Sequence, residues 1–197
     1  MLDERFVFVG FAIGIFGNLS YAYYVLRGKV KPNRVTWGLW TLAPLMAFFA
    51  QVNEGVGLQS VMALGVGLGP LVVFIASFLN KSSYWKLGRW DYVYGVLAML
   101  GLGLWWVTGD GLVAILFAIV ADGLAAIPTI KKAYREPETE SSLAFGLCTL
   151  SALIIMLTVD EWTIEEFSFP VYILLVCILL FVLIRFRLGP TLTEKLD

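Results

Sequence analysis

The chain has 197 residues, a formal net charge of −1 and no histidine, with 59% hydrophobic and 15% charged residues. Soluble domains contain about 45–50% apolar and about 25% charged residues, so this composition argues against a soluble globular protein. The absence of histidine excludes His-ligated haem, His-containing zinc sites and His-dependent nucleophilic couples, and the near-zero charge gives no overall attraction to nucleic acid.

Apolar segments of a length suited to crossing a bilayer follow one another along the chain. A span needs about 20 mostly apolar residues, and a backbone in lipid must satisfy its own hydrogen bonds, which favours helices. We therefore predict an all-α integral membrane protein with seven transmembrane helices. They are Phe6–Leu26, Val35–Val52, Leu58–Leu79, Tyr92–Val107, Leu112–Ile130, Leu143–Val159 and Phe169–Ile184.

The charges in the breaks between these segments predict the orientation. Every second break, together with the tail, holds the basic residues Arg27, Lys29, Lys31, Arg34, Lys81, Lys86, Arg89, Lys131, Lys132, Arg135, Arg185, Arg187 and Lys195. The other breaks hold only acidic charges, from Glu54, Asp110, Asp160, Glu161, Glu165 and Glu166. Because Lys and Arg stay on the cytoplasmic side, the N-terminus is predicted outside and the C-terminus inside a cell membrane, such as a bacterial inner membrane.

An internal repeat divides the chain into two halves. Residues 37–42 read Trp-Gly-Leu-Trp-Thr-Leu, and residues 145–150, which lie 108 positions later, read Phe-Gly-Leu-Cys-Thr-Leu. The same offset places the first three segments on the last three and leaves the fourth unpaired. Two triplets of helices share one orientation only if an extra span separates them. We predict a first three-helix bundle at 1–80, a linker helix at 81–110, and a second bundle with a short cytoplasmic tail at 111–197.

This plan resembles the PQ-loop and SWEET superfamily of small-solute transporters, and the resemblance covers nearly the whole chain in topology. The family carries a Pro-Gln pair near the inner end of the first helix of each triplet. Here Pro128 stands at the proline and Thr129 replaces the glutamine, whereas Ser20 and Tyr21 occupy the position in the first half. The resemblance implies two bundles that rock about a central site, with Pro128 as a hinge. Because a proline inside a helix removes a backbone hydrogen bond, Pro44 and Pro70 are further kink sites. Vitamin transporters of the nicotinamide-riboside type have a similar plan.

Asp122 is the only Asp, Glu, Lys or Arg well inside a predicted span. A central acidic charge costs about 2.5–3.5 kcal/mol on insertion, so the side chain is expected to face protein or water. It is a candidate proton carrier or partner of a cationic substrate, and the alternative is a hydrogen-bonded residue of helix packing. The other residues predicted to bind substrate or protons are Asn18, Trp40, Thr41, Thr149, Tyr21 and Tyr172.

These features predict a small-solute transporter or facilitator that works by alternating access and couples to protons through Asp122. The alternative is a receptor or scaffold of the same fold that transports nothing. The solute is left open between a sugar, an amino acid and a vitamin, and an oligomer is compatible with the sequence. No enzyme is expected, because one central carboxylate lacks a second acid–base partner, and no metal, cofactor or nucleic acid is expected. The charged loop 131–142 could latch the inner gate by salt bridges, but exposed pairs contribute only about 0–1 kcal/mol each, so a solvated loop is expected.

Overall fold

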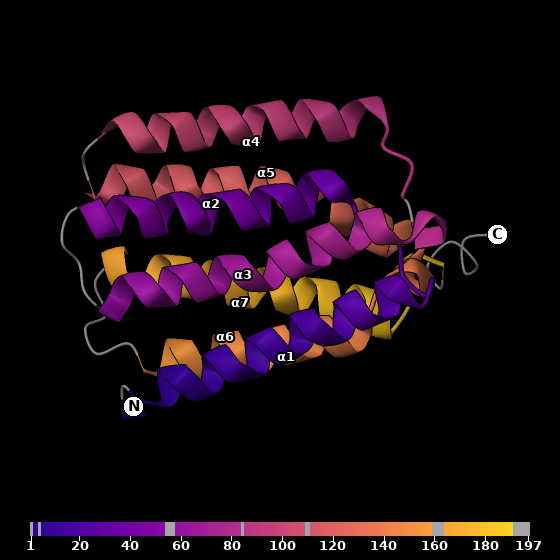
Figure 1. The fold of residues 1–197 in the computed structure, drawn as a ribbon, viewed down its shortest axis with the longest axis horizontal. Helices are drawn as coiled ribbons and strands as arrows, with labels where there is room; N and C mark the ends of the chain where they lie inside the picture. Colours follow the sequence, from indigo (N-terminus) through magenta and orange to yellow (C-terminus); the bar gives the residue numbers. More distant parts are fainter. Residues whose placement is uncertain are drawn as a thin grey trace.

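The computed structural model describes residues 2–3, 5–53, 58–83, 85–108, 111–158 and 164–190, and within these ranges the chain is helical without a strand. The long helices run in chain order from the N-terminus (Figure 1): α1 Phe6–Leu26, α2 Arg34–Asn53, α3 Leu58–Leu79, α4 Arg89–Thr108, α5 Gly111–Arg135, α6 Ser142–Leu157 and α7 Ile164–Arg185. Two short 3-10 turns, η1 Lys81–Ser83 and η2 Pro137–Thr139, lie in the connections.

Each predicted apolar segment coincides with one of these helices, and the bounds of α1 and α3 agree with those predicted. The largest differences are at α5, which continues to Arg135, and at α7, which begins at Ile164. Both extensions contain polar residues. Hydropathy marks where a helix stops being apolar, whereas the backbone hydrogen bonds continue for another turn.

The helices that follow the two repeat-related loops are capped in the same way. Asn33 Oδ1 accepts hydrogen bonds from the backbone N–H groups of Val35 (3.0 Å) and Thr36 (3.3 Å) at the start of α2. Ser141, which is 108 residues later, accepts one from the N–H of Ala144 (3.2 Å) at the start of α6. Such caps satisfy backbone donors that the first helical turn leaves unpaired.

The helices run alternately in opposite directions (Figure 1), and their packing follows the two-half division. Helix α3 packs against α1 and α2, while α7 packs against α5 and α6. Between the halves, α1 packs against α6 and α2 packs against α5. This set of contacts is unchanged when α1, α2 and α3 are exchanged with α5, α6 and α7. Helix α4 lies outside this arrangement, against α5 and α2 (Figure 1).

Glycines bring α1 and α6 close together. A Cβ at Gly10 would lie 2.9 Å from Ile155 Cγ1, and one at Gly17 would lie 3.2 Å from the carbonyl oxygen of Ala144. Ser151 of α6 also donates a hydrogen bond of 2.6 Å to the carbonyl of Gly10. Larger residues would push the two helices apart, so the glycines fix a close α1–α6 interface.

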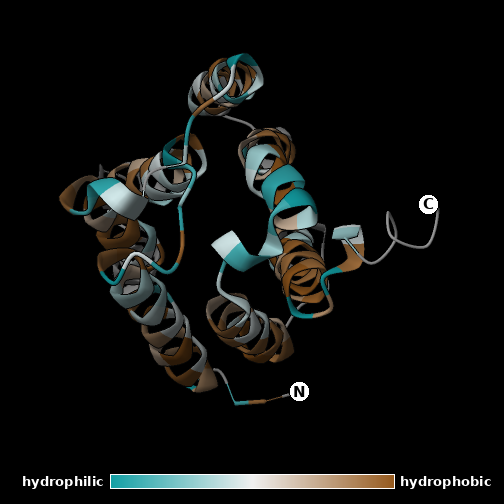
Figure 2. Cartoon of the chain, turned by 90° about the vertical axis from the view of Figure 1, so that its right-hand side faces the viewer, coloured by the Kyte–Doolittle hydropathy of each residue, from teal (hydrophilic) through white to brown (hydrophobic). Residues whose placement is uncertain are grey.

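The surface is apolar along the helices and polar at one end. Phe16 is 63% exposed, Leu100 60% and Leu175 60%. We call one end of the molecule the basic end. It consists of residues 27–33, 80–83, 85–88, 136–141 and 185–190, and it faces the viewer in Figure 2 with its hydrophilic segments. In the described part, Phe6–Leu26 and Ser168–Arg185 are long and apolar enough to cross a membrane. The fold is thus all-helical and compatible with a membrane protein.

Some residues used to predict the orientation lie outside the described residues. They are Glu54, Asp110, Asp160, Glu161 and Lys195, and the side chains of Glu165 and Glu166 are not described either. The described basic residues lie at or next to the basic end, with the exception of Arg5 beside the start of α1.

Candidate functional site

A cavity of about 290 Å³ lies between the two halves and is lined from α1, α2, α3, α5, α6 and α7. It extends from Trp37, in the first turn of α2, to Ile155, near the end of α6. Its described polar and aromatic lining consists of Phe11, Asn18, Trp37, Trp40, Asp122, Phe145, Cys148, Ser151, Phe169 and Cys177. Apolar side chains make up most of the rest. This is the candidate site, because it is enclosed by both halves and contains an acidic side chain.

Positions related by the repeat line this cavity together. Trp37 and Phe145, Trp40 and Cys148, Pro44 and Ala152, and Gly14 and Asp122 are all separated by 108 residues, and all eight contribute to the lining. Each half therefore presents the same positions of its first and second helices to the shared space. The chemistry of the two halves differs, since only one half places a carboxylate there.

Asp122 is held by a phenol from α7. Tyr172 Oη donates a hydrogen bond of 2.7 Å to Asp122 Oδ2, and this contact brings together two of the predicted site residues. Trp40, also predicted, lines the same cavity, and its buried indole N–H faces Asp122, although Nε1 makes no hydrogen bond of normal geometry in the described part. Both groups are neutral, so neither compensates the charge of the carboxylate.

The remaining predicted residues lie in different surroundings. Asn18 lines the cavity, but its amide donates to the carbonyl of Gly14 (2.9 Å) and does not bond to Asp122 in the described part. Thr41 and Thr149 are not part of the described lining; their hydroxyls donate to carbonyls of their own helices, those of Trp37 (2.8 Å) and Phe145 (2.9 Å). Such bonds are the usual way to satisfy a hydroxyl within an apolar helix.

Tyr21 belongs to the closure of the cavity at the basic end and not to its described lining. Its ring is fully buried. The centroid of the Tyr21 ring lies 4.7 Å from that of Trp37 and 6.2 Å from that of Phe145. Trp37 and Phe145 are each 3% exposed, and Leu180 beside them is 0% exposed. These side chains close the cavity toward the basic end.

A buried ion pair lies beyond this aromatic layer. Lys132 Nζ is 2.5 Å from Glu140 Oε1, and both side chains are 0% exposed. Tyr21 Oη donates to Glu140 Oε2 (2.5 Å), and Lys132 Nζ also donates to the carbonyl of Lys31. The network therefore joins α1, the loop before α2, α5 and the loop before α6.

Two members of this network correct the expectation of a solvated loop. Lys132 and Glu140 were expected in water, yet they are buried because they lie opposite one another and share Tyr21 and the Lys31 carbonyl as partners. Burial lowers the pKa of Lys132, and the adjacent Glu140 carboxylate opposes that shift by favouring the charged ammonium. A mixture of signs in a short loop gives no indication of which charges are buried.

The predicted hinge region also joins the two halves. Thr36 of α2 donates to the carbonyl of Ala125 (2.7 Å), and Thr129 of α5 donates to the Thr36 hydroxyl (3.0 Å). Pro128 is buried and lies between Ala125 and Thr129 in the chain. It lacks the backbone N–H that would normally donate to the carbonyl of the fourth residue before it. Pro44, the other predicted kink, lies within α2 and lines the cavity.

The site offers one carboxylate, neutral donors and aromatic surfaces. Among the described residues there is no group of three His, Cys, Asp or Glu side chains that could hold a metal ion. Comparison with protein-family models, curated proteins and solved structures finds no match for this chain. Its chemistry must therefore be argued from its own geometry.

Proposed function

We propose that the protein is a small-solute transporter or facilitator that works by alternating access between the bundles 1–80 and 111–197. Its plan would be that of the PQ-loop and SWEET superfamily, with seven spans in a bacterial inner membrane. The observation that carries the proposal is the cavity between the halves, which reaches Asp122 and is closed at the basic end. Solute sites near mid-membrane between repeats are typical of transporters with such repeats.

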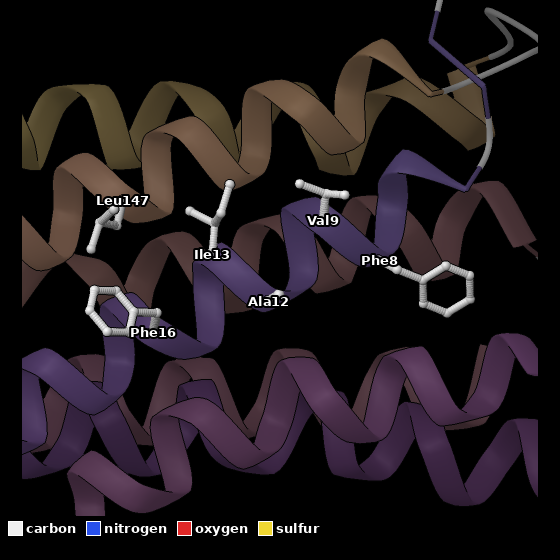
Figure 3. A pocket seen from close by; sticks show the side chains of 6 residues that line it. All are labelled: Phe8, Val9, Ala12, Ile13, Phe16 and Leu147. Atoms are coloured by element: carbon white, nitrogen blue, oxygen red, sulfur yellow. The ribbon is translucent and has the colours of Figure 1, made fainter.

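The surface supports placement in a bilayer. A hollow of about 460 Å³ on the outside of the molecule is lined by Phe8, Val9, Ala12, Ile13, Phe16 and Leu147, all apolar (Figure 3). Phe8 is 50% exposed and Phe16 63% exposed. Large exposed apolar areas of this kind mark contact with lipid or with another protein. The clustering of basic residues at one end supports a cytoplasmic location of that end.

The closed basic end supports alternating access. A transporter of this type must seal the site from one side of the membrane while it is reached from the other. The aromatic layer of Tyr21, Trp37 and Phe145, followed by the Lys132–Glu140 pair, provides such a seal. Opening the site toward the cytoplasm would require these contacts to separate.

Proton coupling through Asp122 is part of the proposal. The titratable groups around it are Tyr172, which donates to it, and the thiols of Cys148 and Cys177, which line the same cavity. The test is uptake of labelled sugars, amino acids and vitamins into liposomes across a pH gradient. We expect gradient-dependent uptake of one class, and its loss in Asp122→Asn. Coupling is wrong if that variant retains both uptake and its pH dependence.

The alternative is a receptor or scaffold that does not transport. The two native cysteines distinguish the possibilities because both line the cavity. A membrane-impermeant methanethiosulfonate reagent should label Cys148 or Cys177 from either side if access alternates, and a Cys148→Ala/Cys177→Ala variant is the control. A scaffold with a fixed interior predicts labelling from one side at most.

A further inference from the structure

The cavity contains an acidic side chain that has no cationic partner in the described lining. Of the described lining residues, Asp122 alone bears a formal charge, and none is Lys or Arg. Tyr172 supplies a neutral hydrogen bond of 2.7 Å to one carboxylate oxygen. An ionised carboxylate in a largely apolar space is costly unless a cation accompanies it.

The lining offers few polar groups. Asn18 Nδ2 donates to the carbonyl of Gly14, and Ser151 Oγ donates to the carbonyl of Gly10, while the indole N–H groups of Trp37 and Trp40 are further donors. A polyhydroxylated solute such as a sugar needs many hydrogen-bond partners, and each one that is missing in a buried site costs affinity. This largely apolar cavity therefore suits a solute with few polar groups and an apolar body.

The walls fit such a body. Trp37, Trp40, Phe145 and Phe169 present aromatic surface to the cavity. Aromatic faces attract a nearby cation through their negative quadrupole, and they also pack against an apolar skeleton. The volume of about 290 Å³ lies at the small end of ligand sites, so the cavity suits a small solute.

We propose that the cavity binds a protonated primary amine with an apolar or aromatic body, whose ammonium group pairs with Asp122. The body lies against the tryptophans, and the ammonium donates to the Asp122 carboxylate between Tyr172 and the indole of Trp40. This inference names the substrate class of the transport site and so rests on the proposed function. It excludes anions, because no positive group of the described lining could receive them.

The test is calorimetric binding to the purified full chain of three probes with similar shapes. Phenethylammonium is the cation, 2-phenylethanol the neutral analogue and 3-phenylpropanoate the anion. We expect the cation to bind at least about tenfold more tightly than the alcohol, and the anion not to bind. Equal affinity for the cation and the alcohol, or no binding of the cation, overturns the proposal.

Variants separate the charge from the shape of the site. Asp122→Asn keeps an acceptor for Tyr172. It should lower the affinity for phenethylammonium about thirtyfold or more and leave the affinity for 2-phenylethanol unchanged. Tyr172→Phe removes a neutral donor but keeps the carboxylate, so it should still bind phenethylammonium more tightly than 2-phenylethanol. Glu138→Gln, an exposed carboxylate at the basic end, controls for net charge and should change nothing. An unchanged cation affinity in Asp122→Asn contradicts the proposal.

Binding and transport fail in distinguishable ways. A protein that binds phenethylammonium through Asp122 but carries no amine across liposomes would contradict the transport proposal and leave this one standing. A protein that carries a sugar or an anion and does not bind phenethylammonium would contradict this inference alone.

Discussion

Among the described residues, the buried Glu140 and the half-buried Asp122 are carboxylates with different charge compensation. Glu140 at the basic end lies 2.5 Å from Lys132 and accepts a further hydrogen bond from Tyr21. Asp122 in the cavity accepts from the neutral Tyr172 and has no cationic partner in the described lining. One chain thus places the same functional group in two settings: the paired Glu140 joins several elements, whereas Asp122 borders a cavity, where we propose that it receives a cation.

Breaking the compensated pair should give the largest loss of stability. Lys132→Met leaves the Glu140 charge buried without its partner, and such losses cost about 3–5 kcal/mol. The free energy of unfolding in mixed micelles is the measurement. Lys131→Met is the matched control, because the neighbouring lysine is exposed and donates to Tyr94. A loss no larger than that of the control would mean that the pair contributes little.

The double variant Lys132→Met/Glu140→Leu sharpens the same point. It removes both charges, so no uncompensated carboxylate remains, and it should be more stable than Lys132→Met alone. If the double variant is the less stable of the two, the cost lies in lost packing and not in the orphaned charge.

Removing the phenol from the compensated site should have a smaller effect. Tyr21→Phe keeps the ring against Trp37 but deletes the hydrogen bond to Glu140, and hydrogen bonds to charged groups contribute about 1.5–3 kcal/mol. The same unfolding measurement applies, with Tyr23→Phe as the control, since Tyr23 is 51% exposed. Equal values for the two variants would contradict the assigned role of the bond.

Neutralising the uncompensated carboxylate should not destabilise the fold. The free energy of unfolding of Asp122→Asn should be greater than that of the parent or lower by no more than about 1 kcal/mol. An amide in an apolar site costs less free energy than a charge there. Unfolding in the absence of amines is the measurement. A loss comparable to that of Lys132→Met would show that Asp122 is structural and would remove the contrast between the two sites.

Breaking the exposed ion pair at the basic end should have the smallest effect on the free energy of unfolding. Glu138 lies 3.5 Å from Arg187, and the two side chains are 58% and 62% exposed. Solvent screens such pairs, so Glu138→Gln should change the free energy of unfolding by less than about 0.5 kcal/mol. A larger change would indicate that burial is not what distinguishes Lys132–Glu140.

The helices could be predicted from the sequence because long apolar runs are separated by short polar breaks. Asp122 could also be identified, since a lone acidic residue inside such a run is conspicuous. The Lys132–Glu140 pair could not, because its burial depends on Tyr21, 119 positions before Glu140, and on the carbonyl of Lys31. The helix faces of Thr41 and Thr149 predict them at the site, but each hydroxyl donates a hydrogen bond to a backbone carbonyl of its own helix.

The close α1–α6 interface has a consequence for how the halves could move. At Gly10 and Gly17, α1 and α6 are in close contact. Separating the two helices would therefore lose this packing and open voids between them. The α2–α5 interface instead includes a pair of hydroxyl hydrogen bonds at Thr36, which can exchange partners at small cost. If the bundles move as proposed, a rotation of one bundle about the α1–α6 line would preserve the first interface. Because α4 contacts both α2 and α5, it would bridge the side that widens and would limit the angle of that rotation.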